Sequence, residues 1–121
     1  MSAVPVSVAL GWIAVIALAI EISFPYLLRP GPLWPHFWTG FLLPVVSFVH
    51  AWLPMQARRM RGVNGAGLRF ATAALLLMIF QAALGLALKG VKAPGRSRAR
   101  GWHFRLMIAL VIAVGFHVWL D

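Results

Sequence analysis

Residues 102–120, WHFRLMIALVIAVGFHVWL, form the stretch around which the rest of the chain can be understood. This apolar run contains His103 and His117, which are fourteen residues apart. The two remaining histidines, His36 and His50, are also fourteen residues apart. Because fourteen residues make close to four turns of an α-helix, both rings of a pair project from one helix face, about 21 Å apart along the axis. The histidines therefore predict two helices that each carry two stacked imidazoles.

The composition is that of a membrane protein. Of the 121 residues, 62% are hydrophobic and only 11% are charged, whereas about a quarter are charged in a soluble domain. The absence of cysteine excludes thiolate-bound iron–sulfur clusters, cysteine zinc sites, disulfides and covalent attachment of a c-type haem. Most of the basic residues behind the net charge of +9 lie in loops beside the apolar runs. That placement fits membrane topology better than nucleic-acid binding.

Four apolar runs are long enough to cross a bilayer as helices. They cover about residues 4–28, 33–56, 68–88 and 102–120, and short loops separate them. We expect a single all-α domain over residues 1–121, a four-transmembrane-helix bundle with up-down-up-down topology. The segment before the first run has no basic side chain, so we expect this run to be a retained helix rather than a secretory signal. Pro44 lies inside the second run and predicts a kink.

In this topology the second and fourth helices run in the same direction. His36 and His103 would then lie at one membrane depth, and His50 and His117 at the other. A shift of 67 residues superposes the histidines of the second run on those of the fourth. We expect the same shift to relate the first helix to the third, as in a duplicated helical hairpin.

The four histidines are candidate metal ligands because a polar residue at membrane depth needs a partner. A zinc ion needs about four donors at one point, whereas each depth here offers two. Haem iron needs only two axial donors, since the porphyrin supplies the other four. The pattern predicts two b-type haems, one ligated by His36 and His103 and the other by His50 and His117. Iron with two axial histidines has no open position and suits electron transfer, and we identify no catalytic site.

Several other residues are candidates for the surroundings of these haems. Gly11 falls at the depth of His50, and Gly85 at the depth of His103; small residues there would let a flat macrocycle approach, although ordinary helix packing explains them equally well. The second nitrogen of each ligand should donate to a carbonyl, hydroxyl or water, for which Ser47 is a candidate. Arginines near the helix ends are candidates for pairing with haem propionates, namely Arg29, Arg100 and Arg105 on one side and Arg58, Arg59 and Arg69 on the other.

Two parallel helices, each with H-x13-H, resemble the haem core of the cytochrome b of quinol:cytochrome c reductases. They are more loosely similar to the dihaem cytochrome b subunits of membrane hydrogenases and formate dehydrogenases. The resemblance covers essentially the whole chain and implies the ligand pairs given above, with Gly11 and Gly85 as haem-facing glycines. The family's fuller set of paired glycines, its additional helices and its Pro-Glu-Trp-Tyr motif are missing from this sequence. Quinol bifurcation is therefore not carried over, and quinone is only a candidate partner.

The leading hypothesis is a subunit that carries electrons within a larger respiratory or photosynthetic oxidoreductase, with redox partner subunits, in a bacterial inner (cytoplasmic) membrane. The loop charges favour both termini outside, whereas the resemblance places the N-terminus inside, so the orientation stays open. An alternative is a small four-helix proton-coupled transporter that uses Glu21, the one acidic residue within a run. Glu21 could also take part in quinone-linked proton transfer or pair with Arg29. A further alternative is an assembly subunit without a cofactor.

Overall fold

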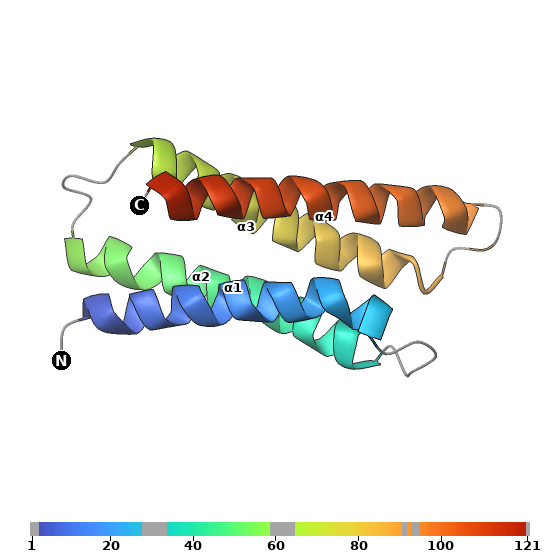
Figure 1. Cartoon of the computed structure of the whole chain (residues 1–121), viewed down its shortest axis with the longest axis horizontal. Helices are drawn as coiled ribbons and strands as arrows, with labels where there is room; N and C mark the ends of the chain where they lie inside the picture. Colours follow the sequence, from blue (N-terminus) through green and yellow to red (C-terminus); the bar gives the residue numbers. More distant parts are fainter. Residues whose placement is uncertain (1–2, 28–33, 59–64, 91, 93–94, 121) are drawn as a thin grey trace. The chain divides into compact units, whose positions relative to one another are not determined.

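The computed structural model describes residues 3–27, 34–58, 65–90, 92 and 95–120. The chain is all-helical over these residues, with α1 at Ala3–Leu27, α2 at Trp34–Arg58, α3 at Gly65–Ala87 and α4 at Gly95–Leu120 (Figure 1). Each of the four helices is long and apolar enough to cross a membrane. The predicted all-helical class and the four spans are therefore confirmed, and they give the chain the character of a multi-pass membrane protein.

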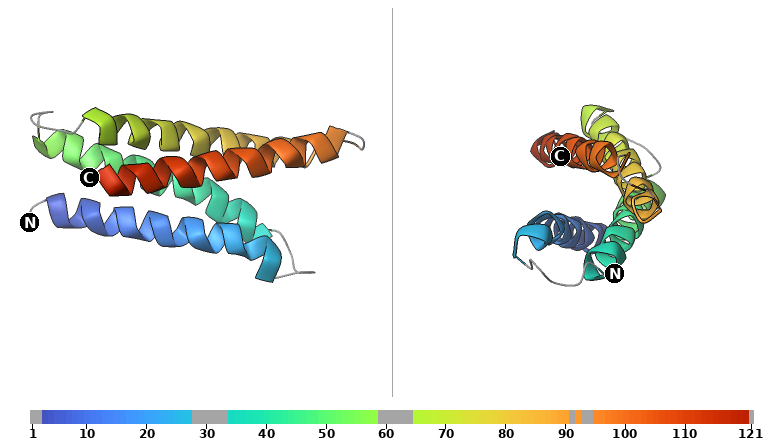
Figure 2. Two further views of the ribbon diagram at one scale, coloured as in Figure 1. Left: turned by 45° about the horizontal axis from the view of Figure 1, so that its top comes forward. Right: turned by 90° about the vertical axis from the view of Figure 1, so that its right-hand side faces the viewer.

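The chain divides into two units, residues 1–62 and 63–121, and each unit is one helical hairpin. In the first hairpin α1 packs along α2, and in the second α3 packs along α4 (Figure 2). The predicted four-helix bundle, with its parallel second and fourth helices, stays a prediction.

The fourth helix is longer than predicted, because it begins at Gly95 rather than near residue 102. The added turns, GRSRARG, are rich in arginine, and Arg96, Arg98 and Arg100 are exposed. Arginine is among the better helix formers, so the helix continues where the sequence is no longer apolar. Apolar length therefore predicted the part of α4 that suits a bilayer but not the basic turns before it.

The second helix continues through Pro44 without a break. Proline removes one backbone hydrogen bond, to the carbonyl of Gly40, and membrane helices tolerate this loss. Pro35 lies in the first turn, where its missing N–H would have had no intrahelical partner. The helix α2 is assigned on both sides of Pro44, and this assignment does not measure a bend. The expected kink there stays a prediction.

The first helix buries two polar residues and exposes several of its large apolar residues. Ser7 and Glu21 are only 5% and 6% exposed, whereas Ile13, Ile16 and Ile20 are each more than half exposed. In a soluble protein this distribution would be unfavourable. In a bilayer it is expected, because lipid solvates the isoleucines and the polar groups need protein partners.

The two hairpins repeat the same pattern of buried positions. Leu43 of α2 and Leu110 of α4 are both buried, and they are 67 residues apart, like the histidines. In α1 and α3 the corresponding buried residues are instead 60 apart, and these are Ser7, Ala14 and Leu18 against Gly67, Ala74 and Met78. A common shift of 67 residues is therefore wrong for the first and third helices. The two shifts differ by seven residues, which is two helical turns, so the same face is presented in both hairpins.

Candidate functional site

His50 of α2 is held by the backbone and side chain of Ser7 on α1. The Nδ1 atom of His50 lies 2.7 Å from the carbonyl oxygen of Ser7, so this nitrogen carries the proton and donates. The Ser7 hydroxyl donates in turn to the carbonyl oxygen of His50, at 3.1 Å. A ring protonated on Nδ1 has its lone pair on Nε2, which is the tautomer required of a metal ligand that binds through Nε2.

Gly11 lies against the same ring. A Cβ atom at Gly11 would come within 2.8 Å of Cε1 of His50, closer than real Cβ contacts allow. In the other hairpin a Cβ at Gly85 would lie 3.5 Å from Cε1 of His103, which is ordinary contact. The predicted depths of Gly11 beside His50 and of Gly85 beside His103 are therefore confirmed within each hairpin. Contact between either glycine and a cofactor stays a prediction.

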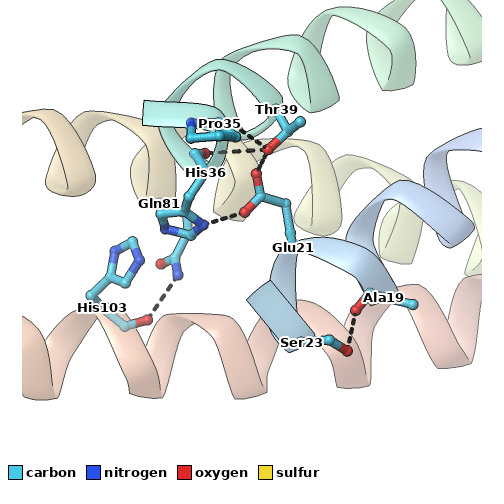
Figure 3. A network of polar contacts seen from close by, with 8 residues as sticks. All are labelled: Ala19, Glu21, Ser23, Pro35, His36, Thr39, Gln81 and His103. Atoms are coloured by element: carbon cyan, nitrogen blue, oxygen red, sulfur yellow. Dashed lines mark hydrogen bonds and ion pairs between the residues drawn. The ribbon is translucent and has the colours of Figure 1, made fainter. Parts of the chain in front are cut away.

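At the other end of the first hairpin, the Glu21 carboxylate lies between two residues of α2 (Figure 3). Nδ1 of His36 forms an ion pair with Oε2 of Glu21, and the hydroxyl of Thr39 donates to Oε1. The Thr39 hydroxyl also lies 2.8 Å from the carbonyl oxygen of Pro35. Both histidines of α2 therefore contact α1 through Nδ1, His50 at a backbone carbonyl and His36 at a carboxylate. Arg29, the partner proposed for Glu21 from the sequence, lies outside the described residues.

The second hairpin places a neutral residue where the first has Glu21. Gln81 of α3 donates from Nε2 to the backbone carbonyl oxygen of His103, at 2.9 Å (Figure 3). Near the other end of α4, the rings of Phe70 and Phe116 stack across the helix pair with centroids 5.0 Å apart. His117 follows Phe116 directly and is half-buried.

Arg105 is exposed near the start of α4, and its guanidinium lies over the ring of Trp102, 5.4 Å from the ring centroid. Together with Arg98 and Gly101, these two residues line a surface hollow. The cationic group is therefore available at the surface, and its pairing with a propionate stays a prediction. Among the other predicted propionate partners, Arg59 and the side chain of Arg58 lie outside the part of the chain that is described.

Sequence reasoning missed Ser7, Thr39 and Gln81 as neighbours of the histidines. For Ser7 and Gln81, the sequence contained a signal in the spacing between residues of the same helix. Ser7 and Glu21 are fourteen residues apart on α1, and the histidines of α2 have the same separation. In an antiparallel pair, equal spacing on both helices brings both polar residues of one helix opposite both histidines of the other. Gln81 follows the buried Gly67 by the same fourteen residues.

Comparisons with protein-family models, with curated proteins and with solved structures found no match for this chain. What the histidines do must therefore be argued from the chemistry of their surroundings.

Proposed function

We propose that this protein carries electrons across a membrane through two b-type haems. His36 and His103 would ligate one iron, and His50 and His117 the other. The observation that carries the proposal is the shared spacing of the four histidines on two helices of membrane-spanning length. A haem with two axial imidazoles supplies a one-electron iron couple with no open position for oxygen or substrate.

The contacts within the first hairpin support this proposal. His50 donates from Nδ1 to the backbone carbonyl of Ser7, and Nδ1 of His36 is paired with the carboxylate of Glu21. Metal-ligating histidines characteristically make such a bond, because it orients the ring and makes the coordinating nitrogen more basic.

The small residues of the hairpins also fit the proposal. A Cβ at Gly11 would lie 2.8 Å from Cε1 of His50, so glycine is what lets this imidazole lie against α1. The ring is therefore held between a glycine on one side and the Ser7 carbonyl at its Nδ1 edge. A fixed ring orientation is what axial ligation requires, since iron binds the lone pair along one direction.

Electron carriers of this kind work with partners, and we propose redox partner subunits of a larger oxidoreductase in a bacterial inner (cytoplasmic) membrane. The exposed basic turns at the start of α4, with Arg96, Arg98 and Arg100, are suited to docking an acidic partner. Quinone is a candidate electron donor or acceptor.

Haem content tests the proposal directly. The full chain, produced with an adequate haem supply and purified in detergent, should show b-type bands in a reduced-minus-oxidised absorbance spectrum. The pyridine haemochrome assay should give two haems per chain. Protein that is folded by circular dichroism but contains no haem would overturn the proposal.

A second candidate function is proton-coupled transport that uses Glu21. Its supporting observation is the burial of this carboxylate within a membrane-spanning helix. This reading leaves the spacing of the four histidines unexplained. Glu21-dependent binding of a lipophilic cation to haem-free protein would favour the transporter. An assembly subunit without a cofactor would instead tolerate replacement of all four histidines.

A further inference from the structure

The surface hollow near the start of α4 is built on one face of that helix. It is lined by Arg98, Gly101, Trp102 and Arg105. These four residues have the i, i+3, i+4, i+7 spacing that places side chains along one face of an α-helix. The hollow measures about 360 Å³, within the range of about 300–1,000 Å³ that is usual for small-molecule sites. It is therefore large enough to take the polar group of a small ligand.

The two charged residues of this hollow are both cations. Arg98 and Arg105 are exposed. Glu21, the one acidic residue in the part of the chain that the structure describes, is paired with His36 in the other hairpin. The two guanidinium groups are therefore not neutralised by any described carboxylate. A guanidinium group binds phosphate oxygens through two parallel hydrogen bonds, so phosphate is an anion that suits this pair.

Trp102 holds one of the two cations in place. The guanidinium of Arg105 lies over the Trp102 ring, 5.4 Å from its centroid. Side chains of an α-helix lean toward its N-terminus, so Arg105 reaches back over the preceding turn and into the hollow. The cation–π contact keeps its charge at that position.

The length of α4 places the hollow at the level of lipid headgroups. The helix has 26 residues and is therefore about 39 Å long, whereas the hydrocarbon core of a bilayer is about 30 Å thick. The apolar part of α4 begins at Trp102, and tryptophan is enriched at the boundary between lipid and water. The basic turns before it therefore extend beyond the hydrocarbon, to the depth at which lipid phosphates lie.

We propose that this hollow binds the phosphate group of an anionic phospholipid. Arg98 and Arg105 hold the phosphate, and an acyl chain runs along the apolar part of α4. Ile112 continues the same helix face seven residues after Arg105 and is 54% exposed, which offers such a chain an apolar surface. For Arg105 the lipid is an alternative to the propionate predicted from the sequence. The proposal does not depend on bound haem and is compatible with either candidate function.

Native mass spectrometry of the full chain in a non-ionic detergent, titrated with phosphatidylglycerol, tests the proposal. The wild type should retain one phosphatidylglycerol per chain. Phosphatidylcholine, whose headgroup has no net charge, should bind roughly tenfold more weakly or worse. Arg98→Gln/Arg105→Gln should weaken the binding of phosphatidylglycerol by a similar factor of roughly tenfold or more.

Arg96→Gln/Arg100→Gln is the matched control. It removes the same charge from the same basic turns, but each position lies about 200° around the helix from Arg98. The affinity for phosphatidylglycerol should therefore fall much less than in Arg98→Gln/Arg105→Gln. Equal losses in the two double variants would show a general attraction between a basic helix and anionic lipid, and would overturn the proposal.

Trp102→Leu distinguishes a built site from such a general attraction, because it keeps every charge. Loss of the ring releases Arg105 and should weaken phosphatidylglycerol binding about two- to fivefold. Trp119→Leu removes an exposed tryptophan near the other end of α4 and should leave the affinity unchanged. An unchanged affinity in Trp102→Leu would contradict the assigned role of the ring.

Equal affinities of the wild type for phosphatidylglycerol and phosphatidylcholine would also overturn the proposal. Displacement of phosphatidylglycerol by millimolar inorganic phosphate would identify a site for free phosphate and defeat the assignment to a lipid. Circular dichroism checks the folding of each variant. If Arg98→Gln/Arg105→Gln does not fold, the single variants decide, and each should weaken binding about fivefold. The haem content of the wild type decides the proposed function separately.

Discussion

The two hairpins bury the same helix positions but fill them with different chemistry. In the first hairpin Glu21 contacts the ring of His36, whereas in the second Gln81 contacts the backbone of His103. The first also has the buried Ser7 where the second has Gly67. The first hairpin therefore places a carboxylate and a hydroxyl beside its histidines, whereas the second has Gln81 and Gly67 at the corresponding positions of α3.

This difference separates the features that both hairpins need for helix packing from the features that serve a particular histidine. Small residues recur at the buried positions of both hairpins because they let the helices approach closely. Among the residues that the structure describes, a buried carboxylate and a buried hydroxyl occur only in the first hairpin, so close packing alone does not require them. They are better explained by the rings that they contact.

The largest effect is expected from removing the histidines in pairs. His36→Ala/His103→Ala and His50→Ala/His117→Ala should each lower the haem content from two per chain to one, because each pair supplies both axial ligands of one iron. The pyridine haemochrome assay on purified protein measures this content. If His36→Ala/His50→Ala, which crosses the pairs, retained one intact bis-histidine haem, the proposed pairing would be wrong.

A smaller effect is expected from adding one methyl group at each glycine. Gly11→Ala should destabilise the protein by about 1–3 kcal/mol, because the new Cβ would overlap the His50 ring. Gly85→Ala should be neutral or stabilising by up to about 1 kcal/mol, since its Cβ would make ordinary contact and alanine favours helix. Unfolding by sodium dodecyl sulfate in mixed micelles gives both values, and equal losses would contradict the difference in packing.

The aromatic pair of the second hairpin should contribute less. Phe70→Leu removes the stacking on Phe116 and should cost about 0.5–1.5 kcal/mol. Phe80→Leu is the matched control, because Phe80 lies on the same helix and is 63% exposed. Its effect should stay within about 0.5 kcal/mol. The same micelle unfolding assay compares them, and an equal loss in both variants would show that the stack adds nothing.

The smallest effect is expected at Ser7. Ser7→Ala removes the hydroxyl bond to the His50 carbonyl and should cost about 0.6 kcal/mol, the average for a hydrogen bond between membrane helices. Ser23→Ala is the control, because the Ser23 hydroxyl donates to Ala19 of its own helix. Haem content should stay unchanged in Ser7→Ala, since the acceptor for His50 is the Ser7 backbone. Loss of haem would show that the hydroxyl holds the ring.

Much of the secondary structure could be predicted from the sequence, because hydropathy and helix length report directly on bilayer crossing. The predicted start of α4 was wrong, since its first turns are helical but basic. The depths of Gly11 and Gly85 could be predicted because helices of similar length with short connections run antiparallel in near-register. The shift in residue number that relates α1 to α3 could not be predicted from the sequence. Two candidate shifts that differ by two helical turns bring the same face of the helix into the pair, so the pattern of residues does not distinguish them.

The partners of the histidines were the least predictable part of the candidate site. Hydropathy identifies Glu21 as an unusual residue in a span but gives no partner for it. Ser47 was chosen because it lies one turn from His50 on the same helix, whereas the described contact comes from Ser7 on the neighbouring helix. Contacts across a helix pair depend on register and rotation, and neither is visible in one helix alone.

The sequence by itself determined that this chain forms four helices long and apolar enough to span a membrane, and that its histidines fall in two equally spaced pairs. These properties depend on hydropathy and on the fixed rise of a helix, which act within one segment. Only the tertiary structure decided that Glu21 and Ser7 both face α2, one against each histidine. That outcome depends on how two helices rotate and slide until their buried polar groups find partners, because lipid offers them none.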